Sequence, residues 1–378
     1  MVTTRLVSIS ASTGLISRCG VLPSGPDRAP VNFHRTLSPA LTSRTVSPGS
    51  SRMSQSRSGA QTTVGWVWPN RKTTSPSAPT DRLAGLSRQS PESCVARASD
   101  ALSGTALQYA RDRVQGRPID EEIGAPIVDH PDVRRMLMHM KTRLMGARAI
   151  CMATAAAADL AECAADEDVR KAAHRREALL TPVAKSYGSD LGVEAASIGV
   201  QVHGGMGLVE ETGAAQHYRD ARIAPIYEGT NGIQAIDLVG RKLRRDGGEA
   251  MREMIAELRD IHARASDSEG ADLLAKALGD GIETMATATD IMLNASDRDA
   301  LAGASAYLEL VGHVLAGAFL VKATVNGRAS GDADAGNMGA LATYHALRVM
   351  PEAASALDYL RRSSETVFGY PENALADL

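Results

Sequence analysis

Residues 132–164 read DVRRMLMHMKTRLMGARAICMATAAAADLAECA and already indicate a helical protein. Their apolar side chains recur at three- and four-residue intervals, which places them on one face of a helix: Val133, Met136, Leu137, Met140, Leu144, Ala147 and Ile150. Pro131 lies just ahead, and proline suits the first helical position because its missing N–H is not needed there. We therefore predict one long helix that packs lengthwise in a bundle, with its methionines as core filler.

The composition of the whole chain agrees with an all-helical body. The 378 residues suffice for two or three domains, and 44% of them are hydrophobic but only 3% aromatic. The sequence contains no run of about 18 apolar residues, so it does not predict a membrane span. The four cysteines show neither zinc-site spacing nor a paired pattern. We therefore expect no metal site. We expect the cysteines to be free thiols and the protein to be cytoplasmic.

The first quarter of the chain differs from the remainder in charge and pattern. Residues 1–100 hold 12 basic and 4 acidic residues, whereas the remainder holds 29 basic and 40 acidic ones. Residues 1–98 are rich in Ser, Arg and Pro without helical or strand periodicity, so we predict a disordered segment. A coding region read in the wrong frame is an equal alternative. A transit peptide, which would direct the chain to the mitochondrial matrix, is a third. Without interleaved aromatic residues we expect no nucleic-acid binding by this segment.

A second long helix is predicted from near Glu177 to His203, with Pro182 at its start or at a kink. Glycines follow at positions 204, 205 and 207. They fit either a left-handed helix cap or a place where a bulky ligand approaches the backbone. Residues 213–226, GAAQHYRDARIAPI, predict a shorter helix after them.

Residues 225–243, PIYEGTNGIQAIDLVGRKL, place Glu228 in a short loop before the next helix. Thr230 or Asn231 offers a capping oxygen for that helix. An apolar stripe then follows: Ile233, Ile236, Val239 and Leu243. A carboxylate near a helix N-terminus is favourable to the helix dipole on its own, so the residue type alone does not assign a function.

Two segments, YARDRVQGRPI (109–119) and QVHGGMGLVEETGAAQHYRDARIAPIYEGTNGIQ (201–234), change that interpretation. Together they make residues 99–245 closely resemble the C-terminal helical domain of acyl-CoA dehydrogenases. Residues 249–378 resemble the accessory helical tail of the larger members, and we interpret His313 there as a core residue. The resemblance implies an up-and-down helical bundle followed by a second helical domain. It also implies a flavoprotein that desaturates acyl-CoA between the α and β carbons.

The resemblance assigns roles to particular residues. Glu228 of the YEGT motif would be the catalytic base, since α-proton removal must accompany departure of a β-hydride to the flavin, and a carboxylate in a dry site is a stronger base. The flanking residues Tyr227 and Gly229 would shape the substrate channel. The FAD contacts would be Arg113, Gln201, Gly205 and Thr230, with Arg113 on the diphosphate. Some relatives carry glutamine where Gly232 stands, so that contact is not expected here.

The family's other domains are not recognisable in this sequence. An N-terminal helical domain and a middle β domain precede the bundle in such enzymes, so we expect the chain alone to lack efficient activity. One hypothesis is an acyl-CoA dehydrogenase, as a truncated or frame-shifted version, with acyl-CoA as substrate and electron-transfer flavoprotein as electron acceptor. The other is a non-catalytic helical module that packs in dehydrogenase oligomers. A homo-oligomer is expected in either case.

Overall fold

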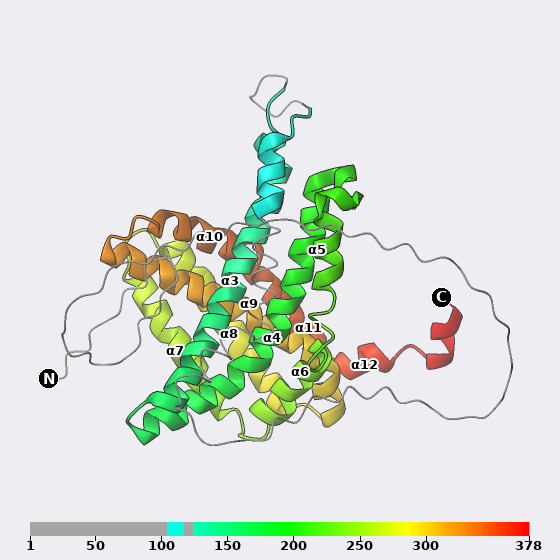
Figure 1. Ribbon diagram of the computed structural model, residues 1–378. Coiled ribbons are helices and arrows are strands. Elements are labelled where there is room, and N and C mark those ends of the chain that lie inside the picture. Colours follow the sequence, from blue (N-terminus) through cyan, green and yellow to red (C-terminus); the bar gives the residue numbers. More distant parts are fainter. Residues whose placement is uncertain (1–103, 117–123, 378) are drawn as a thin grey trace, which may run out of the picture. The chain divides into compact units, whose positions relative to one another are not determined.

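The computed structural model describes residues 104–116 and 124–377 (Figure 1). Within these ranges every regular element is a helix, and the β pairing found there is an isolated bridge between Val114 and Pro126. The prediction of an all-helical protein is confirmed. The predicted disordered segment, residues 1–98, lies outside the described residues, and so does the choice among its three interpretations.

Two long helices form the frame of the first bundle: α3 (Pro131–Cys163) and α4 (Glu167–His203). Only residues 164–166 join them, so the two helices run antiparallel and pack along much of their length (Figure 1). The bounds of α3 agree with the prediction to within one residue, and Pro131 begins the helix as expected. A shorter helix over residues 104–112 precedes them, drawn in cyan.

The predicted start of α4 was wrong. This helix begins at Glu167, ten residues before Glu177, because the Asp166 carboxylate accepts hydrogen bonds from the N–H groups of Asp168 and Val169. Pro182 lies in the interior of α4, so it does not mark the start of the helix. The predicted end at His203 is confirmed, and Gly204 follows with a φ of 59°.

Short elements connect α4 to the tail. In chain order they are η2 (Gly204–Leu208), η3 (Glu210–Thr212), α5 (Ala214–Ala221), α6 (Asn231–Asp237) and the π-helical turn η4 (Leu238–Leu243). The predicted apolar stripe after Glu228 is only half buried: Val239 and Leu243 lie in the core, but Ile233 and Ile236 are exposed. The two exposed residues belong to α6, whereas the two buried ones belong to the π turn η4 that follows it.

The tail consists of helices packed around one central helix. They are α7 (Glu249–Ser266), α8 (Asp272–Asn294), α9 (Asp297–Ser330), α10 (Ala335–Arg348), α11 (Met350–Arg361) and α12 (Ser363–Phe368), followed by η5 (Glu372–Asp377). Helix α9 contacts α3 and α4 of the first bundle as well as the tail helices (Figure 1). One hydrophobic cluster therefore includes Ile150 and Leu180 together with Leu258 and Val314. His313 on α9 is buried in this core, as predicted.

Two of the described helices, α3 and α9, reach the length and hydropathy of a membrane span, with mean hydropathy of 1.3 and 1.6. In α9, 83% of the apolar window is buried against other helices, as in the central helix of a bundle. In α3 the buried share is 28%. A core helix meets the same criteria, so composition alone is weak evidence for a span.

Candidate active site

The loop before α6 has an unusual backbone. Among the residues that the structure describes, Glu228 is the only non-glycine residue with a positive φ, 55°. Gly229 follows with a φ of 87°. A side chain in this left-handed region costs on the order of 1 kcal/mol, so such residues persist only where surrounding contacts hold them. The loop is closed by a hydrogen bond from the N–H of Asn231 to the Pro225 carbonyl oxygen, 3.0 Å.

The carboxylate of Glu228 is open to solvent. Within the described part of the chain, neither this carboxylate nor the N–H of Glu228 has a hydrogen-bond partner. The Glu228 carbonyl oxygen accepts a hydrogen bond from the Gln234 side-chain amide at 3.4 Å. The loop thus presents one free acceptor and one free donor on the same residue, an arrangement that can take a proton and hold a carbonyl oxygen.

The other predicted loop residues flank Glu228 directly. Tyr227 is half-buried, and its N–H bonds to the Ile223 carbonyl oxygen. Gly229 must be glycine, because its φ is left-handed and a Cβ there would approach the Gln234 amide at 3.4 Å. Thr230 caps α6, and its Oγ1 accepts a hydrogen bond from the Ile233 N–H at 3.4 Å. The capping prediction is confirmed for Thr230, whereas Asn231 is the first helical residue.

A polar cluster that the sequence did not reveal lies under this loop. Lys185, buried in α4, donates to the Gly229 carbonyl oxygen and to Asn231 Oδ1. Ser189 contacts the same Asn231 side chain. Desolvation raises the pKa of the neighbouring Asp190 carboxyl, while a hydrogen bond with Asn231 and the charge of Lys185 act in the opposite direction. The available sequence signal was a lysine within the otherwise small or apolar run PVAKSYG of residues 182–188.

Three of the four predicted cofactor residues lie at one end of α4. The rings of Tyr109 and His203 stack with centroids 4.5 Å apart, which brings the helix over residues 104–112 against the end of α4. Arg113 follows that first helix, and Gln201 and Gly205 flank His203. Thr230, in contrast, lies with Glu228 at the level of Lys185. Gln201 is 16 residues farther along α4, or roughly 24 Å at 1.5 Å per residue.

The glycines at this end have different reasons to be glycine. Gly204 has a left-handed backbone, and a Cβ on Gly207 would collide with the Val200 carbonyl oxygen. Gly205 has neither constraint, since its φ is not positive and a Cβ there would meet nothing within 4 Å. The fold itself does not need Gly205 to be glycine, which is the pattern expected where a ligand approaches the backbone from outside.

The donors at these positions suit a dinucleotide such as FAD. Arg113 is exposed and uses one guanidinium nitrogen toward Gln115, at 3.3 Å, which leaves further donors for a diphosphate. The Gln201 side chain is also exposed. The Thr230 hydroxyl accepts a capping hydrogen bond and keeps its own proton for donation. The residues present are therefore compatible with the predicted cofactor, in two groups separated along α4.

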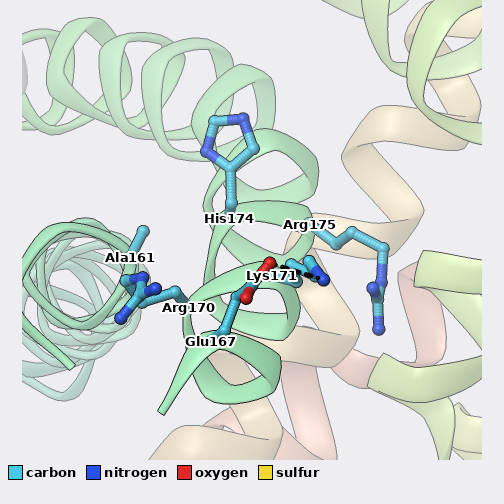
Figure 2. Close-up of a pocket in the computed structure, with 6 residues that line it drawn as sticks. All are labelled: Ala161, Glu167, Arg170, Lys171, His174 and Arg175. Atoms are coloured by element: carbon cyan, nitrogen blue, oxygen red, sulfur yellow. Dashed lines mark ion pairs between the residues drawn. The ribbon is translucent and has the colours of Figure 1, made fainter. Parts of the chain in front are cut away.

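A hollow lies where α3 ends and α4 begins, and its lining is mostly basic (Figure 2). Lys171 there pairs with Glu167 at 2.8 Å, and Arg175 pairs with Glu253 at 2.6 Å. Arg170 donates to the carbonyl oxygens of residues 164 and 165. Because these cations are engaged by the protein itself and lie at the far end of α4 from Gln201, this hollow is not part of the candidate site.

Comparisons with known proteins identify relatives of both helical parts of the chain. Residues 87–243 match the family described as acyl-CoA dehydrogenase, C-terminal domain, and residues 249–371 match the family described as acetyl-CoA dehydrogenase C-terminal like. The 3-methylmercaptopropionyl-CoA dehydrogenase of Ruegeria pomeroyi is 44% identical over 220 residues, which cover 56% of this chain and 37% of that protein. FadE5 of Mycobacterium tuberculosis, a broad-specificity linear acyl-CoA dehydrogenase, is 35% identical over 61% of this chain and 40% of its own length.

A more distant relative is the caffeyl-CoA reductase-Etf complex subunit CarC of Acetobacterium woodii, 29% identical over 37% of this chain and 32% of that protein. Among solved structures, an acyl-CoA dehydrogenase from Bacillus anthracis complexed with FAD superposes with a TM-score of 0.56 at 18% identity. This match covers 76% of this chain and 49% of the other, and it supports the fold alone. The chain thus spans at most about two fifths of the length of these curated relatives. By these matches, residues 87–243 form the C-terminal domain of an acyl-CoA dehydrogenase, and residues 249–371 form the C-terminal-like helical tail that follows it.

Proposed function

We propose that this chain supplies the proton acceptor and part of the cofactor site of an FAD-dependent acyl-CoA dehydrogenase, which converts acyl-CoA to trans-2-enoyl-CoA. The observation that carries the proposal is the backbone of Glu228. A non-glycine residue in the left-handed region, with its carboxylate free and its loop braced from α4, is a feature that the packing of the chain does not require.

The residues of the loop fit the reaction as follows. The Glu228 carboxylate takes the α-proton of the thioester, which is only weakly acidic. The free N–H of the same residue can donate to the thioester oxygen, where negative charge develops as the proton leaves. FAD, held by the residues named below, would supply the acceptor for the β-hydrogen, which leaves as hydride. One proton and one hydride then leave the substrate, and a carbon–carbon double bond forms between the α and β carbons.

The substrate and cofactor contacts are proposed from the resemblance and are supported by the positions of the residues. Tyr227 and Gly229 border the acceptor and would face the acyl chain. Arg113, Gln201 and Gly205 would hold the diphosphate and adenine part of FAD, and the Thr230 hydroxyl would donate near the flavin. The exposed isoleucines beside the loop, Ile223, Ile226, Ile233 and Ile236, offer an apolar rim that would exclude water once covered.

Electron-transfer flavoprotein is the proposed electron acceptor. Support comes from the Acetobacterium woodii relative, which is a subunit of an Etf complex. Self-association of the chain into a homo-oligomer is proposed as well, because an exposed apolar rim of this kind is commonly covered in an assembly.

The test uses a chimera in which residues 104–378 replace the matching segment of the Ruegeria pomeroyi dehydrogenase. We expect the chimera to retain FAD and to show flavin bleaching on addition of that enzyme's acyl-CoA substrate. Glu228→Gln, which keeps size but removes the base, is expected to slow bleaching by about a thousandfold with flavin still bound. Glu211→Gln is the matched control, because Glu211 is another exposed glutamate on a nearby connection, and it is expected to leave the rate unchanged.

Either of two results would contradict the proposal. Unchanged bleaching in the Glu228→Gln chimera would remove Glu228 from the role of base. A folded chimera that never retains FAD would contradict the cofactor assignment and would favour the non-catalytic helical module.

A further inference from the structure

The cluster under the Glu228 loop centres on a buried lysine. Lys185 is only 6% exposed. Its Nζ lies 2.8 Å from the Gly229 carbonyl oxygen and 2.7 Å from Asn231 Oδ1. These acceptors are 44 and 46 residues away in sequence, so the contact ties the centre of α4 to both ends of the turn that follows Glu228.

Asn231 extends the attachment. Its side-chain amide donates to the Ser186 carbonyl oxygen at 3.2 Å and to Ser189 Oγ at 2.9 Å. Its own N–H closes the loop onto Pro225. Two side chains therefore hold the loop over residues 225–231 to α4. Lys185 of α4 donates to the loop, and Asn231 of the loop donates to α4.

Packing alone gives no reason for a lysine at this position. A buried ammonium group is costly unless its donors are satisfied, and an apolar side chain of similar length would fill the same space without that cost. The benefit of an ammonium is directional, because charge-assisted hydrogen bonds are about twice as strong as neutral ones and fix the carbonyl that accepts them. Here that carbonyl belongs to the residue directly after Glu228.

We propose that Lys185 is a positioning residue for the proton acceptor. By holding the Gly229 carbonyl oxygen, it fixes the peptide that follows Glu228 and keeps Glu228 in its left-handed conformation, with the side chain open to solvent. The catalytic consequence rests on the function proposed above. The conformational consequence does not, and it can be measured without turnover.

The experiment is amide hydrogen exchange on the purified full chain, for the wild type and for Lys185→Met, Lys185→Arg and Asn231→Ala. The reporters are the amides of Tyr227 and Asn231, whose hydrogen bonds close the loop, compared with amides of α9. Lys185→Met is expected to speed exchange in the loop at least tenfold and to leave α9 unchanged. Lys185→Arg, which keeps a charged donor, is expected to restore exchange toward the wild-type rate.

Lys322→Met is the matched control, because Lys322 is a helical lysine that pairs with Glu257 and does not touch the loop. It is expected to leave loop exchange at the wild-type rate. If Lys185→Met does not fold, Asn231→Ala removes the second attachment from a half-buried position and is expected to show the same local increase.

Three results would overturn the proposal. Loop amides in folded Lys185→Met could exchange at the wild-type rate, or amides of α9 could show the same increase as the loop. The third is an exchange rate in Lys185→Arg that is no closer to the wild-type rate than that of Lys185→Met. Each is independent of the function. Full bleaching in the Glu228→Gln chimera would contradict the base assignment while leaving the loop result intact. An inactive Glu228→Gln chimera with unchanged loop exchange in Lys185→Met would contradict the positioning role alone.

Discussion

His345 on α10 and Glu228 on the loop before α6 are both polar residues in unusual surroundings, yet one is fully buried and the other is open to solvent. His345 Nε2 donates to the His313 carbonyl oxygen at 2.8 Å inside the helical core. Glu228 lies on a strained backbone, and its carboxylate has no hydrogen-bond partner among the residues that the structure describes. The first is explained by the packing of this chain. The second is left accessible to a ligand by the residues that the structure describes.

The same contrast holds for the residues around each of them. Near His345, the Tyr187 hydroxyl bonds to His313 Nδ1 at 3.0 Å, and Arg143 pairs with Glu194 at 3.1 Å. This network joins α3, α4 and α9, so it makes the bundle and the tail one core. Around Glu228, apolar side chains lie open instead: Ile223 is 58% exposed and Ile233 is 51% exposed. Exposed apolar groups beside a free carboxylate are typical of a binding surface rather than of a core.

The largest expected effect on stability comes from crowding the interior at α9. Gly312 lies against the Tyr187 ring, where a Cβ would collide with the ring carbons. Gly312→Ala is expected to lower the free energy of unfolding by about 3 kcal/mol, because tightly packed cores tolerate added atoms poorly. The control is Gly336→Ala on α10, where a Cβ meets nothing within 4 Å, and a gain of up to about 1 kcal/mol is expected from helix propensity. If urea unfolding gives Gly312→Ala and Gly336→Ala the same free energy of unfolding, the interior around α9 is loosely packed.

The second effect is pH-dependent and also belongs to the interior. Desolvation lowers the pKa of His345 from 6.5 to about 3. The unfolded chain therefore binds a proton between these values that the folded chain does not. The contribution of His345 to the free energy of unfolding is complete above pH 6.5 and is lost as the pH falls toward 3. At pH 5 the loss is about 2 kcal/mol, at 1.36 kcal/mol per pH unit.

Urea unfolding at pH 7 and pH 5 tests this expectation. His345→Gln keeps an N–H donor for the His313 carbonyl oxygen but does not titrate, so its stability is expected to change much less between the two pH values. The pKa values of the nearby carboxyls of Glu194 and Glu309 are lowered, so their contribution is lost only at more acidic pH. A wild-type drop that survives intact in His345→Gln would assign the acid sensitivity to other groups.

A smaller effect is expected at the start of α6. Thr230→Ala removes the cap from the Ile233 N–H and is expected to cost about 1 kcal/mol. Thr230→Ser keeps the hydroxyl and is the matched control, expected to cost less than half as much. If the Thr230→Ala and Thr230→Ser variants have equal melting temperatures, the hydroxyl cap does not stabilise this helix.

The smallest effect has the opposite sign. Glu228→Gly is expected to stabilise the chain by about 0.5 kcal/mol, because glycine adopts a positive φ without strain and this gain exceeds its extra entropy in the unfolded state. Glu211→Gly, at a residue without positive φ, is expected to destabilise. A stabilising change at the proposed catalytic residue would show that the loop gives up stability for its conformation. A destabilising one would show that Glu228 is not strained.

Local patterns predicted much of this molecule. The spacing in residues 132–164 gave α3 to within a residue, and the YEGT motif identified the loop whose backbone is unusual. The predicted start of α4 was ten residues too late, because the helix is capped by the Asp166 side chain. The exposure of Ile233 depends on what covers it, which helical periodicity does not record. The contact between Lys185 and Gly229 joins residues 44 positions apart and depends on how α4 packs under the loop. Three-dimensional packing of this kind leaves little trace in a single sequence.

The role of Glu228 as proton acceptor is tested most directly by the rate of substrate-dependent flavin bleaching in the chimera described above. The rate is measured under anaerobic conditions for the unsubstituted chimera and for its Glu228→Gln and Glu211→Gln variants. Flavin is expected to stay bound in all three proteins, and the bleaching rate is expected to fall by about a thousandfold in Glu228→Gln alone. Bleaching at the full rate in Glu228→Gln would contradict this role.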